Sequence, residues 1–183
     1  MNNPEWRPAT VADLATIDRI GNVTHVAFQE RAEVFAEKYE RFSEGCFVLV
    51  QKGAVVGYCV SHPWRLYSVP PLDTFLGPLP AHPECLFIHD VVVLPQARHG
   101  GAPGALIEII ATVARQRDID LLALVSVYNT HPLWARHGFQ IVSDPSLSEK
   151  LKSYGNLAKY MVRRLVLKKD RNDLDRSRPN KTL

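Results

Sequence analysis

The chain has 183 residues, a length typical of one domain, and its 46% hydrophobic and 22% charged residues suit an ordinary globular protein. The net charge of +3 comes entirely from residues 168–183, which hold six basic and three acidic side chains, so the rest of the chain is neutral. A neutral body argues against a nucleic-acid-binding face. No apolar run approaches the roughly 20 residues that cross a bilayer, so no membrane partner is expected.

The three cysteines lie in or beside apolar runs and have no metal-ligand spacing. Cys46, Cys59 and Cys85 are therefore expected to be reduced and buried, and no metal site is expected. The opening residues MNNPEWRP lack the charged and apolar regions of a signal peptide. These features predict a cytoplasmic protein.

In its first part the chain alternates strand and helix patterns. The expected elements are a strand at 5–9, a helix capped by Thr10 or Asp13 that ends before Gly21 and Asn22, a less regular helix at 25–39, and strands at 46–51 and 55–62. Residues 63–83 hold six prolines, a density that neither helix nor sheet tolerates, and are expected to form a long loop beside a site. Trp64, Tyr67 and Phe75 in this loop could form the wall of a substrate pocket, or could simply pack within the loop.

The second part predicts a buried strand, a glycine-rich loop and an amphipathic helix, followed by shorter elements. The expected elements are a strand at 86–94, a loop at 95–102, a helix at 103–117, a strand at 121–127, a short helix at 132–137, and strands at 139–142 and 160–167. Residues 168–183 are charged and poor in apolar residues, so they are expected to be a disordered tail behind a domain at 1–167. The pattern predicts an α/β domain with a mixed sheet.

The loop QARHGGAPG joins the 86–94 strand to the helix that follows it. Backbone N–H groups and the helix dipole at such a helix start form an anion site that suits a pyrophosphate. Gly100 and Gly101 permit a close approach of the backbone, Arg98 adds a charge, and Pro103 suits the first helical turn. The alternative is that the glycines serve only the strand-to-helix connection.

The segment LFIHDVVVLPQARHGGAPGALIEII resembles the acetyl-CoA-binding motif of the GNAT superfamily. The matching positions are Val91, Val93, Pro95, Arg98, Gly101 and Leu106. The opening WRPATVADLATI and the later SVYNTHPLWARHGF are also similar to segments of that family, so the resemblance spans about residues 6–139. It implies the GNAT fold, a central mixed sheet of about six or seven strands flanked by helices.

The resemblance also implies acetyl-CoA as the cofactor, with its pantetheine arm along Val91 and Val93 and its pyrophosphate on the amides of 98–104. The cofactor residues implied are Val91, Val92, Val93, Arg98, His99, Gly100, Gly101, Ala102, Pro103, Gly104, Asn129 and Trp134. Three features depart from the family pattern: His99 replaces a common glycine, Pro103 replaces the final Gly or Ala, and the gap from Asn129 to Trp134 is short.

Acyl transfer to an amine needs a base that removes a proton, and His89 is the best candidate in the sequence. Regular alternation places it on the same face of its strand as Val91 and Val93, and places Asp90 on the other face in a structural role. Arylalkylamine N-acetyltransferases, which the strand also resembles, keep a water-linked histidine at the matching place. The alternative for His89 is a core histidine bonded to a backbone carbonyl.

The departing thiolate is usually protonated in the resembling family by a tyrosine, four residues before a Gly-Phe pair. Trp134 stands at that position here, and an indole N–H has no usable acidity. Tyr128 and His131 are the nearby candidate acids, although Tyr128 could instead pack between a strand and a helix. Because thiolates are good leaving groups, protonation by water or by the product ammonium is a further alternative.

These features together predict an acetyl-CoA-dependent N-acetyltransferase that acts on the primary amine of a small molecule by direct attack in a ternary complex. No cysteine stands beside a base, which disfavours an acyl-enzyme. The alternatives are a peptide or protein acceptor, or a catalytically weak acyl-CoA-binding regulatory protein. The expected assembly is a monomer or homodimer.

Overall fold

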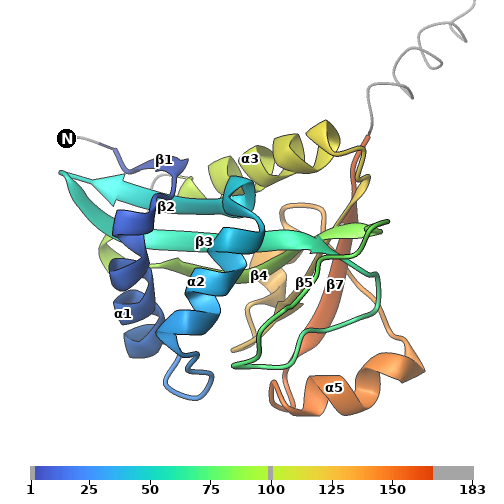
Figure 1. The fold of residues 1–183 in the computed structure, drawn as a ribbon. Coiled ribbons are helices and arrows are strands. Elements are labelled where there is room, and N and C mark those ends of the chain that lie inside the picture. Colours follow the sequence, from blue (N-terminus) through green and yellow to red (C-terminus); the bar gives the residue numbers. More distant parts are fainter. Residues whose placement is uncertain (1–2, 99–100, 167–183) are drawn as a thin grey trace, which may run out of the picture.

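The computed structural model describes residues 3–98 and 101–166, and these form one sheet with helices on both of its faces (Figure 1). The sheet has seven strands in the order β1-β2-β3-β4-β5-β7-β6. The strands are β1 (Glu5–Pro8), β2 (Cys46–Gln51), β3 (Ala54–Trp64), β4 (Cys85–Val93), β5 (Leu121–Ser126), β6 (Gln140–Ile141) and β7 (Lys159–Arg164). Only β4 and β5 pair in parallel, so the mixed α/β sheet expected from the sequence is confirmed.

The helices divide between the two faces of the sheet. They are α1 (Leu14–Thr24), α2 (Ala32–Arg41), α3 (Ala102–Gln116), α4 (His131–Ala135) and α5 (Ser148–Lys152). Apolar side chains of α1 and α2 pack on one face around Tyr58, whereas those of α3 pack on the other face around Ile88 and Leu122. A third apolar cluster around Phe87 and Tyr160 lies beneath α5. No helix in the described ranges is both long and apolar enough to span a membrane.

Two helix boundaries differ from the sequence prediction. The first helix was expected to end before Gly21, but α1 continues to Thr24. Gly21 is fully covered there, because a Cβ at this position would lie 2.7 Å from the hydroxyl oxygen of Tyr58. The glycine therefore serves close packing of α1 on β3. The second helix was expected from His25, but α2 begins only at Ala32, and residues 25–31 form an irregular connection.

The proline-rich segment at 65–84 contains no helix or strand, as expected, while Pro63 and Trp64 extend β3. Two carboxylates hold this loop in place, one in α2 and one in the segment before it. Glu37 accepts hydrogen bonds from the backbone N–H groups of Leu76 (3.1 Å) and Gly77 (3.0 Å), and Glu30 accepts one from Asp73 N–H at 3.0 Å. The loop is thereby fixed against the region before α2. Helix α5 was not predicted, and the tail expected at 168–183 lies outside the described residues.

Candidate functional site

The site begins where β4 and β5 separate. The two strands pair only between Leu86–Ile88 and Leu122–Leu124, although both continue further. Beyond Ile88 they enclose one side of a cavity of about 660 Å³. Its lining residues are Thr24, His25, Phe28, Glu30, Leu72, Ile88, His89, Asp90, Val91, Val92, Val93, Arg98, Pro103, Leu106, Leu124, Val125, Val127, Tyr128, Thr130, Leu133, Trp134 and Tyr154.

A β-bulge in β4 places two polar residues side by side at this point. Val60 of β3 pairs with Asp90, but the next residue, Ser61, pairs with Ile88, so His89 is an extra residue in β4. His89 and Asp90 consequently both face the α1 and α2 side of the sheet, where His89 meets Glu30 and Asp90 meets Tyr58. The expectation from regular alternation, that His89 shares a face with Val91 and Val93, is therefore wrong.

The main chain of β4 has one side that β3 does not use. The N–H of Leu94 donates to the carbonyl of Val56 at 2.9 Å, which identifies these opposed residues as a hydrogen-bonded pair. Hydrogen-bonded pairs alternate along an antiparallel ladder. The N–H and C=O groups of Val91 and Val93 therefore point away from β3, along the cavity wall. The side chain of Arg98 donates to the Val93 carbonyl at 2.9 Å.

The start of α3 forms the end of the cavity beyond β4. Gly101 precedes the helix in the left-handed conformation (φ 79°), and a Cβ there would meet no atom within 4 Å. Pro103 lies in the first turn and lines the cavity together with Arg98. The unpaired N–H groups of a first helical turn and the helix dipole favour an anion here. His99 and Gly100 lie outside the described residues.

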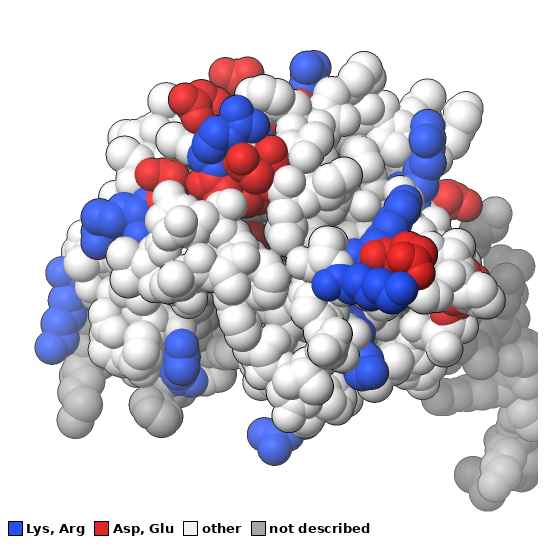
Figure 2. Space-filling view, turned by 90° about the horizontal axis from the view of Figure 1, so that it is seen from below, with Lys and Arg blue, Asp and Glu red and all other residues white. Residues whose placement is uncertain are grey.

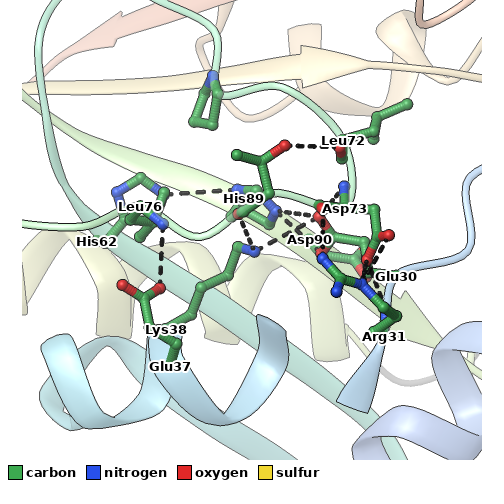
Figure 3. A network of polar contacts seen from close by, with 12 residues as sticks. Glu30, Arg31, Glu37, Lys38, His62, Leu72, Asp73, Leu76, His89 and Asp90 are labelled. Atoms are coloured by element: carbon green, nitrogen blue, oxygen red, sulfur yellow. Dashed lines mark hydrogen bonds and ion pairs between the residues drawn. The ribbon is translucent and has the colours of Figure 1, made fainter. Parts of the chain in front are cut away.

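His89 belongs to a buried network with Glu30, Lys38 and His62 (Figure 3). Its Nε2 lies 3.2 Å from Glu30 Oε2, and its Nδ1 lies 3.5 Å from Nε2 of His62. Lys38 Nζ lies 3.4 Å from Glu30 Oε1, and the Lys38 side chain has no exposed surface. Glu30 thus carries the negative charge that two buried basic groups share.

Burial and neighbouring charges shift the pKa values in this network, and for Glu30 and Lys38 they do so in opposite directions. Burial raises the pKa of Glu30, but the hydrogen bond and charge of His89, the charge of Lys38 and the Asp73 N–H outweigh it and lower that pKa to about 2. For Lys38, burial outweighs the attraction of Glu30, and the pKa of its amine is lowered. Burial and then the charge of His89 hold the pKa of His62 well below its usual value. Glu30 is therefore ionised at neutral pH and His62 is neutral.

These partners use both nitrogens of His89. Nδ1 of His62 faces the carbonyl of Pro63 at 3.3 Å and must donate to it, so Nε2 of His62 is an acceptor. His89 Nε2 donates to the Glu30 carboxylate, and His89 Nδ1 faces Nε2 of His62 at 3.5 Å. Both nitrogens of His89 are therefore directed at protein groups of the network.

Asp90 organises a second polar group beside the first. One carboxylate oxygen accepts a hydrogen bond from the Tyr58 hydroxyl, and the other lies 3.0 Å from Nε2 of His25. Nδ1 of His25 is buried without a hydrogen-bond partner among the described residues. The His25 ring lies parallel to the ring of Tyr128, with centroids 5.8 Å apart. The structural role expected for Asp90 is consistent with these contacts, although it also lines the cavity.

Sequence reasoning missed His25 as a site residue. It stands 65 residues before Asp90 and ends α1, where no motif marks it. The local signal is weak: His25 directly follows α1, the helix that packs against the sheet through the buried Gly21. Glu30, Phe28, Leu72 and Tyr154 were missed for the same reason, because only the fold brings them to the cavity wall.

The segment after β5 brings two of three predicted residues to the cavity. Tyr128 and Trp134 line it, and Trp134 also packs edge-on against Phe139 with ring centroids 5.6 Å apart. Tyr128 is 51% exposed, and burial followed by the Asp90 charge raises the pKa of its hydroxyl. Asn129 is exposed and does not line the cavity, so the structure places it away from the position expected for a cofactor contact.

The three aromatic residues predicted for the acceptor pocket lie elsewhere. Trp64 packs edge-on against His62, Tyr67 packs against Tyr160, and Phe75 lies under the guanidinium of Arg31. The structure places none of them in the cavity wall, because Trp64 belongs to β3 and the loop that carries Tyr67 and Phe75 folds over α2 and β7. The alternative of ordinary loop packing describes Tyr67 and Phe75.

Charges of both signs lie together on one face of the molecule. Figure 2 shows Lys and Arg interspersed with Asp and Glu among many uncharged residues on the face seen from below. Within residues 3–98 and 101–166, no cluster of three or more histidine, cysteine or acidic side chains has the arrangement of a metal site. The cavity is apolar apart from the polar groups already described.

A sheet that opens between two parallel strands above a helix N-terminus defines a protein that holds an extended ligand with an anionic end. Residues 11–139 match the family model described as "Acetyltransferase (GNAT) family". The chain therefore belongs to this family and is an acyltransferase, and the resemblance of the sequence motifs is confirmed. The search of curated protein sequences gave no match.

Solved structures with the same fold are numerous and distant in sequence. N-acetylglutamate synthase from Neisseria gonorrhoeae, complexed with coenzyme A and N-acetyl-glutamate, shares 23% identity over 91% of this chain with a TM-score of 0.65. This chain covers only 36% of that protein. Ard1 from Thermoplasma volcanium (16% identity, 90% of this chain and 99% of that one, TM-score 0.65) is similar along its whole length. So is the GNAT-like decarboxylase GphF in complex with isobutyryl-CoA (16% identity, 88% and 100%, TM-score 0.69).

Proposed function

We propose that this protein transfers an acetyl group from acetyl-CoA to the primary amine of a small molecule, by direct attack in a ternary complex. The observation that carries the proposal is the separation of β4 and β5 above the start of α3. It leaves main-chain N–H and C=O groups along an apolar cavity that leads to an anion site. Pantetheine has amides and a thiol, and its nucleotide carries a pyrophosphate, so coenzyme A fits both features.

Several of the predicted cofactor residues have a role in this proposal. The main-chain groups of Val91 and Val93 pair with the pantetheine amides, and the first turn of α3 with Arg98 holds the pyrophosphate. Trp134, which lines the cavity, flanks the thioester in this arrangement. Structures of two similar proteins contain coenzyme A or isobutyryl-CoA, which supports an acyl-CoA in the same fold.

The lining of the cavity beyond the cofactor strand favours a small amine over a peptide as the acceptor. Phe28, Leu72 and Tyr154 line the cavity there, beside the polar groups of His25, Glu30 and Asp90. Tyr154 is tied to the loop by its hydroxyl, which donates to the carbonyl of Pro70 at 2.7 Å. The aromatic lining is compatible with the likeness to arylalkylamine N-acetyltransferases. The similar structure of the NatC complex bound to Gag peptide and CoA represents the peptide alternative.

Tyr128 provides the proton for the departing thiolate in this proposal. Its raised pKa keeps the hydroxyl protonated at neutral pH, and its partial exposure allows the proton to be replaced from solvent. The three cysteines are free and buried, and burial raises the pKa of Cys46 and Cys85 to about 12, so none is a nucleophile. The reduced cysteines fit a cytoplasmic protein.

The test is calorimetry with coenzyme A together with thiol release from acetyl-CoA in the presence of a panel of small amines and of N-terminal peptides. We expect saturable binding of coenzyme A and amine-dependent thiol release that is greatest with a small aromatic amine. Binding without release for any amine would indicate a regulatory protein. Release only with peptides would replace the small acceptor by a peptide.

A further inference from the structure

Besides Tyr128, which is the proposed acid, and Arg98 at the cofactor end, the cavity wall contains five titratable groups that could take part in proton transfer. They are His25, Glu30, His89, Asp90 and Tyr154. Acetylation of an amine needs one group that accepts a proton at neutral pH. The hydrogen bonds of each group decide which one can do so.

Four of the five groups are poor acceptors. Glu30 has a pKa of about 2 and is bonded to His89, Lys38 and a backbone N–H. Both carboxylate oxygens of Asp90 are bonded, to Tyr58 and to His25. Both nitrogens of His89 face protein groups, Glu30 and His62, and burial raises the pKa of Tyr154 so that its hydroxyl stays protonated.

His25 has the arrangement of a held base. A carboxylate can only accept, so Asp90 fixes the hydrogen on Nε2 of neutral His25 and leaves the lone pair on Nδ1. The His25 side chain lines the cavity, and its Nδ1 is buried with no partner among the described residues, a state that costs free energy unless a ligand or water completes it. A carboxylate that holds one nitrogen while the other meets the substrate is the arrangement of a general base.

From this arrangement we infer that Nδ1 of His25 is the general base, and that Asp90 and Tyr58 position it. The inference rests on the proposed function. As the neutral amine attacks the thioester carbonyl, its N–H proton passes to Nδ1, directly or through one ordered water. The N–C bond forms, the C–S bond breaks, and the thiolate leaves with the electron pair and takes the Tyr128 proton. The imidazolium and the phenolate then exchange the balancing proton through solvent.

Ionisation of His25 depends on the groups around it. Burial lowers its pKa, but the hydrogen bond and charge of Asp90, followed by the charge of Glu30, outweigh burial and raise that pKa above 6.5. Tyr128 faces the ring from the segment after β5, and Tyr58 reaches Asp90 from β3. The base form is the neutral one, so activity is expected to rise with pH through a midpoint above 6.5 and to fall as pH drops below it.

The first test compares the pH dependence of kcat in wild type, His25→Gln, Asp90→Asn and the matched control His82→Gln, with one amine throughout. His82 is exposed and lies outside the cavity wall. We expect His25→Gln to lower kcat at least about a hundredfold and to abolish the rise of kcat with pH (the pH limb), with an unchanged Kd for coenzyme A. Asp90→Asn should lower kcat and move the limb to lower pH, whereas His82→Gln should match wild type.

Two further measurements separate a base from a structural residue. Added imidazole should restore part of the activity of His25→Ala, and long-range ¹H–¹⁵N spectra should show His25 with its hydrogen on Nε2 and a titration midpoint that falls in Asp90→Asn. A full kcat and unchanged limb in His25→Gln would overturn the inference, as would loss of the limb in His89→Gln alone. No turnover by folded wild type with any amine would instead overturn the proposed function, and with it any assignment of a base.

Discussion

Glu30 compensates more buried charge than any other residue near the cavity. It faces Lys38, whose side chain has no exposed surface, and His89, whose side chain is 4% exposed. A buried ammonium or imidazolium without a counter-charge is strongly unfavourable. The carboxylate of Glu30 therefore holds together α2, the bulge in β4 and, through the N–H of Asp73, the loop at 65–84.

Replacing Glu30 by glutamine should therefore destabilise the fold by about 3–5 kcal/mol at pH 7, because the two basic groups lose their partner. The folded-state pKa of Glu30 is lowered to about 2, so its stabilisation is complete above the ordinary carboxyl pKa and is lost as pH falls through about 2. Urea unfolding at pH 7 and at pH 3 measures both effects. Glu33→Gln, at an exposed position in the first turn of α2, is the control. Equal loss of stability in the two variants would contradict the role of Glu30.

The bulge at His89 is the residue-scale feature that sequence could not predict. Alternation correctly put Asp90 and Val91 on opposite faces of the strand. The rule assumes one residue per position in the ladder, however, and the extra residue turns His89 to the same face as Asp90. Nothing in LFIHDVVVL distinguishes a bulged strand from a regular one. The partners of His89 also lie 27 and 59 residues away, beyond the reach of any local pattern.

Helix α1 reaches the site through its packing against β3. Gly21 lies against the Tyr58 hydroxyl, and that hydroxyl donates to Asp90, which in turn holds His25 at the end of the same helix. The sequence interpretation treated Gly21 as a helix breaker, which is its usual effect in isolation. Close packing with the sheet overrides that preference here.

Gly21→Ala should destabilise the protein by about 1–3 kcal/mol, even though alanine favours a helix by about 1 kcal/mol over glycine. The new Cβ would lie 2.7 Å from the Tyr58 hydroxyl oxygen and must displace it. Tyr58→Phe removes that oxygen, so the same substitution should cost less in the Tyr58→Phe background. A double-mutant cycle measured by chemical denaturation gives the coupling. An equal cost in both backgrounds would show that the hydroxyl is not the obstacle.

The strands were largely predictable, since apolar runs with turn residues between them mark β2, β3, β4 and β5, and the motif from Leu86 to Gly104 marks the unit from β4 to the start of α3. The cavity was predictable only in part. Its cofactor side follows from one continuous segment, β4 to α3, whereas its acceptor side combines residues from the α1–α2 connection, the proline-rich loop and the region after α5. Because only the fold brings the acceptor side together, the aromatic residues predicted from the 63–83 segment do not line the cavity.

The separation of β4 from β5 gives β4 two unlike edges, and this predicts opposite effects of proline at neighbouring positions. The Val91 N–H points into the cavity, so Val91→Pro should leave the β3–β4 ladder intact and retain the fold. It should weaken coenzyme A about tenfold through the loss of one hydrogen bond, worth about 1–1.5 kcal/mol. Val92→Pro removes a donor that faces β3 and should destabilise the sheet.

Two ligands separate loss of the pantetheine contact from general damage to the site. The nucleotide part of coenzyme A, which has no pantetheine arm, binds only at the start of α3 in the proposed arrangement, so Val91→Pro should leave its affinity unchanged. Calorimetry with both ligands, together with thermal unfolding of each variant, measures the difference. Equal weakening of both ligands, or unchanged binding of coenzyme A by folded Val91→Pro, would contradict pairing of the pantetheine with β4. The proposed function requires that pairing, because it is what brings the thioester to the end of the cavity where Asp90 and His25 lie.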